Sequence, residues 1–161
     1  MLQRIQTVFL LMVASLMTIF LFFPLWFINL QGGAEYHRLY AFFYYGFVSG
    51  NSPEETVTFW PYAISGVLAV IATIIAVFEA FSYKNRLTQI KLGALNSLVV
   101  AGALISAVWF TSDIQQIWED IDPGQFGMGV IFPAIALLCN IFANRFIRKD
   151  EKLVKSIDRV R

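Results

Sequence analysis

The chain has 161 residues, of which 58% are hydrophobic and 14% are charged, and its net charge is +1. Soluble domains usually carry about 25% charged residues, so this composition excludes an ordinary soluble globular domain. The hydrophobic residues fall in four blocks, each close to the roughly 20 residues with which a helix crosses a bilayer core. The sequence therefore predicts an all-α membrane protein, with four transmembrane helices bundled in a single domain over residues 1–161.

The first block extends over residues 7–28 and contains the unbroken apolar run VFLLMVASLMTIFLFF. A cleaved signal peptide has a shorter apolar region and a small-residue cleavage site, so we interpret this block as a retained span. Three further spans are expected at residues 60–81, 92–110 and 127–147. Spanning β-strands would be about half as long and would alternate in polarity, which excludes a barrel.

Basic residues are distributed unevenly about these spans. All of them except Arg38 precede the first span, lie between the second and third, or close and follow the fourth. The connections on the other side carry most of the acidic residues. Because Lys and Arg accumulate in cytoplasmic segments, both termini are predicted to be cytoplasmic.

The first outer connection, residues 29–59, is too long and too aromatic for a plain linker, and we expect an ordered module. Two conformations remain open for its aromatic part after the Gly32-Gly33 turn signal: a small β-hairpin with residues 26–30, or a short helix in the headgroup region. Further on, Ser52-Pro53-Glu54-Glu55 has the pattern of a helix start. The aromatic side chains expected to contact a partner or the membrane surface are Tyr40, Phe43 and Tyr45.

Two other segments carry candidate contact residues. Beyond the third span, Trp118 belongs to an apolar periodicity that predicts a short amphipathic helix or an extension of the span, with Trp118 at the outer interface. The cytoplasmic tail, residues 148–161, places apolar residues among charged ones, as in a helix lying on a membrane or against a partner; a solvated continuation of the fourth span is the alternative. Its candidate contacts are Leu153, Val154, Ile157, Arg148 and Lys149, whose basic members suit a bilayer with an anionic inner leaflet.

Polar residues within the spans supply the candidate functional site. Intramembrane carboxylates are costly, so Glu79 is a functional hypothesis, with an interfacial ion pair to Lys84 or Arg86 as the structural alternative. The asparagines of the third and fourth spans can hydrogen-bond between helices, which is usually a packing role. The predicted polar site consists of Glu79, Asn96, Asn140 and Asn144.

Residues typical of catalysis are scarce. The single histidine, His37, and the single cysteine, Cys139, supply neither a metal-ligand set nor a disulfide, and no nucleophile and base have a recognisable spacing. We therefore expect no catalytic residues, no metal and no cofactor. The basic residues follow the membrane ends without a recognition module, so no nucleic-acid partner is expected.

Three stretches carry a family resemblance: MLQRIQTVFLLMVASL at the start, FFPLW after the first apolar run and RFIRKDEKLVKSIDRVR at the end. They resemble a family of small bacterial four-span membrane proteins catalogued as a domain of unknown function. The resemblance implies a bacterial inner-membrane location and identifies no activity. The long first outer loop is also similar to the layout of claudins, although the paired loop cysteines of claudins are absent.

These features favour a non-enzymatic accessory or scaffold subunit of a larger inner-membrane complex, bound to a membrane-protein partner. The alternatives are a small transporter or channel that works as a homo-oligomer and uses Glu79, and a protein that binds a lipid or quinone between its helices.

Overall fold

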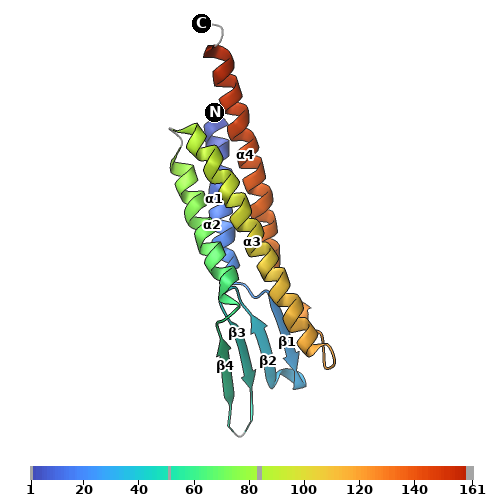
Figure 1. Ribbon diagram of the computed structural model, residues 1–161. Coiled ribbons are helices and arrows are strands. Elements are labelled where there is room, and N and C mark those ends of the chain that lie inside the picture. The colour runs from blue at the N-terminus through green and yellow to red at the C-terminus, as the bar shows by residue number, and fades with distance from the viewer. Residues whose placement is uncertain (1, 51, 83–84, 159–161) are drawn as a thin grey trace.

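The computed structural model describes residues 2–50, 52–82 and 85–158, with side chains for 5–30, 32–50, 52–82 and 85–153. Four helices lie side by side, and a sheet lies at one end of them (Figure 1). The helices are α1 (Leu2–Phe20), α2 (Ala63–Phe81), α3 (Arg86–Trp118) and α4 (Ile131–Asp158). The strands are β1 (Trp26–Leu30), β2 (Glu35–Leu39), β3 (Tyr44–Val48), β4 (Glu54–Thr58) and β5 (Gln125–Phe126), with short 3-10 helices η1 (Gln31–Gly33) and η2 (Met128–Val130).

The predicted all-α fold class is wrong, because the outer segments form a five-stranded antiparallel sheet. Its strand order is β4-β3-β2-β1-β5. The hairpin alternative is correct for β1 and β2, which turn through glycines at positive φ, Gly32 and Gly33. The helix expected from Ser52 onward is instead β4, since its residues Thr56, Val57 and Thr58 are β-branched and favour a strand over a helix.

The predicted four-span topology is also corrected. Within the described residues, three helices are long and apolar enough to cross a membrane, which makes this a membrane-type protein: Ala63–Phe81, Arg86–Trp118 and Met128–Leu153. The apolar part of α1 within the described residues is shorter, Ile5–Phe20. The predicted first span was overextended because Leu25, Trp26 and Ile28 are apolar for a different reason: they are buried in and beside the sheet.

The helices pack through buried positions that recur at alternating three- and four-residue spacing, the pattern of left-handed helix packing. Each helix contacts two others: α1 packs on α2 and α4, and α3 packs on the opposite sides of the same two helices. Close to the sheet the buried residues of α2, α3 and α4 are mainly alanines, which let the backbones approach. These alanines are Ala69, Ala72, Ala76, Ala103, Ala107 and Ala136.

The sheet is fixed to the helices by short backbone contacts. The Gly66 amide donates to the Ala41 carbonyl at 2.8 Å, so the turn between β2 and β3 sits on the start of α2. The Gly127 amide donates to Leu25 O at 2.8 Å, and a Cβ at Gly127 would overlap the Pro24 carbonyl oxygen. The entry into α4 therefore lies directly against the segment that joins α1 to β1.

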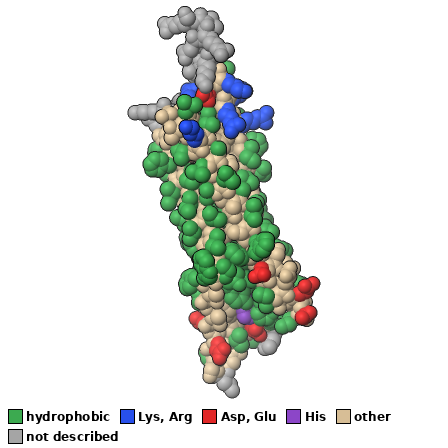
Figure 2. All heavy atoms as spheres, viewed as in Figure 1, with side chains coloured by type: hydrophobic (Ala, Val, Ile, Leu, Met, Phe, Trp, Pro, Cys, Tyr) green, Lys and Arg blue, Asp and Glu red, His purple; other side chains and the backbone are tan. Residues whose placement is uncertain are grey.

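The charged residues separate along the molecule. On the face seen in Figure 2, Lys and Arg gather at the helical end, most Asp and Glu gather around the sheet, and a hydrophobic band lies between them. Residues 148–158 of the predicted tail are the end of α4, which runs without a break from Ile131 to Asp158, as in the alternative of a continued fourth span.

Candidate functional site

Glu79 lies at the end of the buried stripe of α2, far from the sheet. It follows Ser65, Ala69, Ala72 and Ala76 at helical spacing, so the packing that buries the alanines also buries the carboxyl group. Its side chain is 0% exposed. The interfacial ion pair considered from the sequence is not formed by Arg86, whose Nη1 lies 3.2 Å from Asp150 Oδ2 on α4. Lys84, the other basic residue considered, falls outside the described residues.

Asn140 and Asn144 of α4 meet α3 at Gly93. The Asn140 side-chain amide donates to the Gly93 carbonyl at 3.0 Å and to the Ser97 hydroxyl at 2.8 Å. A Cβ at Gly93 would lie 2.6 Å from Glu79 Oε1 and would overlap Asn144 Oδ1. The missing side chain of Gly93 therefore makes room for Glu79 and Asn144, which approach it from two different helices.

The hydrogen-bonding capacity of this cluster is only partly used. Within the described residues, both carboxyl oxygens of Glu79, Oδ1 of Asn140 and Oδ1 of Asn144 have no hydrogen-bond partner. An ionised carboxylate without a partner is strongly disfavoured in an apolar interior. Carboxyl and amide oxygens that face one buried space are instead suited to share a proton or to hold a cation.

Asn96 is the fourth predicted member of the site, and it lies on the buried stripe of α3 one turn from Gly93. It is 0% exposed, and neither of its side-chain polar atoms has a partner among the described residues. No hydrogen bond joins it to the other three. The structure thus gathers Glu79, Asn140 and Asn144 around Gly93 and leaves Asn96 as a separate buried amide.

Two further buried polar residues were missed from the sequence. The Gln89 side chain of α3 donates to the Glu79 backbone carbonyl at 3.2 Å, and Gln6 of α1 is 4% exposed, with no partner for Nε2 in the described part of the chain. Both occupy buried positions at three- and four-residue spacing from their apolar neighbours. That spacing was the available signal, but each residue lay outside the spans predicted from hydropathy.

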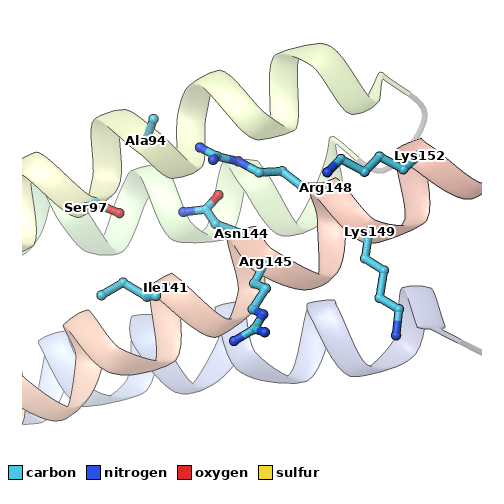
Figure 3. A pocket seen from close by; sticks show the side chains of 8 residues that line it. All are labelled: Ala94, Ser97, Ile141, Asn144, Arg145, Arg148, Lys149 and Lys152. Carbon is cyan, nitrogen blue, oxygen red and sulfur yellow. The ribbon is translucent and has the colours of Figure 1, made fainter.

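A groove between α3 and α4 begins beside the same cluster. It has a volume of about 650 Å³, and its lining includes Asn144, Ser97 and four basic residues of α4 (Figure 3). Two of the four, Arg148 and Lys149, were predicted as membrane contacts, and both are exposed. Leu153 is exposed as well, whereas the side chains of Val154 and Ile157 lie outside the described ones.

The aromatic contact residues predicted in the outer segment have three different settings. Tyr40 and Phe43 flank the turn between β2 and β3, with ring centroids 5.1 Å apart, at the junction with α2. Tyr45 lies in β3 with its ring 5.9 Å from that of Tyr36. Trp118 packs under the sheet at 4.4 Å from the His37 ring and is only partly exposed.

The side of the sheet facing away from Trp118 is an aromatic surface, which we call the outward sheet face. The pairing register places its residues in two cross-strand rows. These rows are Phe27, Arg38, Tyr45 and Val57, and Asn29, Tyr36, Phe47 and Glu55. The Arg38 guanidinium lies 5.3 Å from the Tyr36 ring centre. The pKa of Tyr45 is raised to about 12, mainly by hydrogen bonding with Tyr36 and to a smaller extent by desolvation.

His37 lies on the opposite, inward side of the sheet and is 8% exposed. Its Nε2 is 3.0 Å from Glu35 Oε1, and its ring stacks near Tyr44 at 5.8 Å. A search of the described residues finds no group of three or more His, Cys, Asp or Glu side chains that could hold a metal ion. The burial of Tyr44 raises its pKa to about 12.

Comparison with known proteins gives one match. No curated protein and no solved structure matches the chain. A family model described as a domain of unknown function (DUF4293) matches residues 2–160, in agreement with the family resemblance noted from the sequence. The chain belongs to this family.

Proposed function

We propose that this protein is a non-enzymatic accessory or scaffold subunit that joins a larger complex in the bacterial inner membrane. In this arrangement the basic helical end faces the cytoplasm and the sheet lies on the outer side. The separation of charge supports the orientation, because basic residues gather at the helical end and acidic residues around the sheet.

The observation that carries the proposal is the free edge of the sheet at β4. Strand β4 pairs with β3 on one side, and no described strand pairs with its other side. All five of its residues are exposed. An unpaired edge is a template for a further strand, and soluble proteins commonly block such edges. An extended segment of a partner protein fits this edge by β-strand addition.

The chemistry of the edge defines the partner segment more closely. Glu54 and Glu55 lie in β4, and Val57 is 48% exposed beside Tyr45 on the outward sheet face. A complementary strand therefore carries a Lys or Arg opposite the glutamates and an apolar residue opposite Val57. Main-chain hydrogen bonds would supply the affinity, and these side chains the selectivity.

The test is purification of the protein from its own membrane in mild detergent, with a tag at the end of α4, followed by mass spectrometry. The wild-type protein should retain a stoichiometric membrane-protein partner. Val57→Lys should lose that partner, because it places a cation in the apolar contact. Ile121→Lys is the control, since Ile121 is 68% exposed in the loop before β5, at the opposite edge of the sheet from β4, and this variant should keep the partner. Recovery of wild-type protein alone or only as a homo-oligomer would contradict the proposal.

A second candidate function rests on a different observation, the full burial of Glu79 without a partner for either oxygen. In this candidate a homo-oligomer conducts protons or cations, and Glu79 binds the ion on its way. Proton flux into liposomes containing the purified protein should disappear in Glu79→Gln. It should persist in Glu55→Gln, which neutralises an exposed carboxylate of β4. An unchanged flux in Glu79→Gln would eliminate this candidate.

A further inference from the structure

The groove between α3 and α4 has a strongly basic lining that the proposed functions leave unused. Its polar lining consists of Ser97 from α3 and Asn144, Arg145, Arg148, Lys149 and Lys152 from α4. In Figure 3, Arg148 and Lys152 extend toward α3, whereas Arg145 and Lys149 extend to the other side of α4. The cationic side chains of the groove thus all come from its α4 wall, over two turns of that helix.

The positive charge of this groove is not neutralised by neighbouring carboxylates. No acidic residue lines it, and the four cations have no ion pair within the described part of the chain. Asp150 and Glu151 lie on the same stretch of α4 but do not line the groove, and Asp150 is paired with Arg86 at 3.2 Å. All four cations are exposed. An anion entering the groove therefore meets unpaired positive charge along the α4 wall.

The groove also changes in polarity along its length. Toward the middle of the helices it is lined by Ile141 and Ala94, and toward the end of α4 it is lined by the four cations. A helix rises about 1.5 Å per residue, so the distance along α4 from Ile141 to Lys152 is roughly 16 Å. An occupant with an anionic head and an apolar chain matches this gradient. A free phosphate would match only its basic end.

Asn144 connects this groove to the buried polar cluster. Its side chain is 8% exposed, it lines the groove, and its Oδ1 lies beside Gly93 without a hydrogen-bond partner among the described residues. The side-chain amide also carries two N–H donors, which can bind a phosphate oxygen. A hydrogen-bond donor at the point where the basic and apolar parts meet is suited to the phosphate or glycerol region of a lipid.

From these observations we infer that the groove between α3 and α4 is a binding site for the headgroup of an anionic phospholipid. The lipid phosphate lies among Arg145, Arg148, Lys149 and Lys152, and one acyl chain follows the groove past Ile141 and Ala94. Basic pockets between membrane helices recognise anionic headgroups through this combination of charge and depth. The inference does not depend on the partner proposed for the sheet.

The experiment compares lipids on the full-length protein purified in neutral detergent. Thermal unfolding is followed by tryptophan fluorescence in micelles doped with phosphatidylglycerol or phosphatidylcholine, or supplemented with glycerol phosphate. Phosphatidylglycerol should raise the melting temperature by about 5 °C, because a ligand that binds only the folded state stabilises it. Phosphatidylcholine and glycerol phosphate should leave the temperature unchanged. Native mass spectrometry should count retained phosphatidylglycerol on the same samples.

Matched charge variants locate the effect. Arg148→Gln and Lys152→Gln should each reduce the shift caused by phosphatidylglycerol by at least half, without changing the melting temperature in detergent alone. Lys91→Gln removes one exposed positive charge from α3 at the same end of the molecule but outside the groove, and it should retain the full shift. An equal loss in Lys91→Gln would overturn the inference in favour of general surface charge. An equal shift with phosphatidylcholine, or with glycerol phosphate, would overturn it as well.

Discussion

The two ends of the molecule differ in how far their buried polar groups are hydrogen-bonded. Near the sheet, the Trp26 indole N–H donates to Pro123 O at 3.0 Å, and the Ser65 hydroxyl donates to Ala41 O at 2.8 Å. At the other end, Glu79 and Asn96 are fully buried, and none of their side-chain oxygens or nitrogens has a partner among the described residues. At the sheet end, His37 Nδ1 and Thr111 Oγ1 are also buried without a partner among the described residues, but no buried carboxyl group is. Since most buried polar groups in proteins are satisfied, the energetic cost of unpaired groups is concentrated at the helical end.

This contrast separates positions that define geometry from positions that are available for binding. Hydrogen bonds and close backbone contacts fix the sheet to the helices, so changes there should damage folding. The unpaired carboxyl group of Glu79 contributes little to folding, so its replacement should affect stability weakly or favourably. Five substitutions, two of them controls, test this contrast.

The largest effect is expected for Gly127→Ala at the sheet end. The added methyl group would overlap the Pro24 carbonyl oxygen and approach the Leu25 carbonyl carbon at 3.2 Å, and both are backbone atoms that cannot turn aside. We expect a loss of about 3 kcal/mol in unfolding free energy, at the upper end for an overpacked site, measured by thermal unfolding in detergent.

Gly102→Ala is the control for this substitution. Its added Cβ would meet only Leu68 Cδ1, at an ordinary 3.6 Å, within the helix α3. Alanine is the better helix former by about 1 kcal/mol, so this variant should unfold at the same or a higher temperature than wild type. Equal melting temperatures for the two variants would mean that the contact of Gly127 with Pro24 does not restrain the fold.

An intermediate effect of opposite sign is expected for Glu79→Met. Methionine has a similar length and removes two buried oxygens that have no partner, so the unfolding free energy should rise by about 1 kcal/mol. Asn140→Leu should instead lower it by about 1–2 kcal/mol, because it breaks the bonds to Gly93 O and Ser97 Oγ. Thermal unfolding in detergent at neutral pH measures both. A fall in stability for Glu79→Met as large as that for Asn140→Leu would mean that the unpaired Glu79 supports folding as much as the hydrogen-bonded Asn140, which would contradict the expected difference.

The smallest effect concerns alkaline pH at the sheet end. The pKa of Tyr44 is raised from 10.0 to about 12 in the folded protein by burial. Its phenol therefore ionises more readily in the unfolded chain, so the stability that it contributes is complete below pH 10 and is lost as the pH rises from about 10 to 12. Tyr44→Phe should show a smaller fall in melting temperature over this range. The wild type and Tyr44→Phe should have parallel pH dependence between pH 7 and 9. If the melting temperature of Tyr44→Phe fell as steeply as that of wild type between pH 10 and 12, the loss of stability could not be assigned to Tyr44.

Long apolar runs made the helices predictable. Residues 60–81 match α2 within a few residues, and residues 92–110 and 127–147 fall within α3 and the segment formed by η2 and α4. The hairpin of β1 and β2 was also accessible, because a Gly-Gly turn separates two apolar stretches. Strand β5 was not, since two residues carry no periodicity. The first apolar block ran through the helix end at Phe20 into β1, because a membrane span and a buried strand are equally hydrophobic.

The candidate site was predictable by residue type but not by arrangement. Glu79, Asn140 and Asn144 were chosen because polar groups in apolar segments are costly, and they do meet at one point. The depth of Glu79 could not be read from the sequence, because it depends on where α3 begins. Helix α3 starts at Arg86 rather than near residue 92, and its first turns cover Glu79. The role of Gly93 as the meeting point depends on helix rotation, which hydropathy does not report.

The pairing of β5 with β1 has a consequence for the order in which the chain is made. Strands β1 to β4 leave the ribosome before α2, but β5 follows α3, so β1 has an open edge until two further helices have been synthesised. Only then can Gln125 and Phe126 close that edge and the Trp26 indole find the Pro123 carbonyl. The sheet is thus completed only after both helices between its fourth and fifth strands, α2 and α3, have been made. A chain truncated before residue 123 would lack the acceptor of the Trp26 indole N–H and the strand that pairs with the free edge of β1.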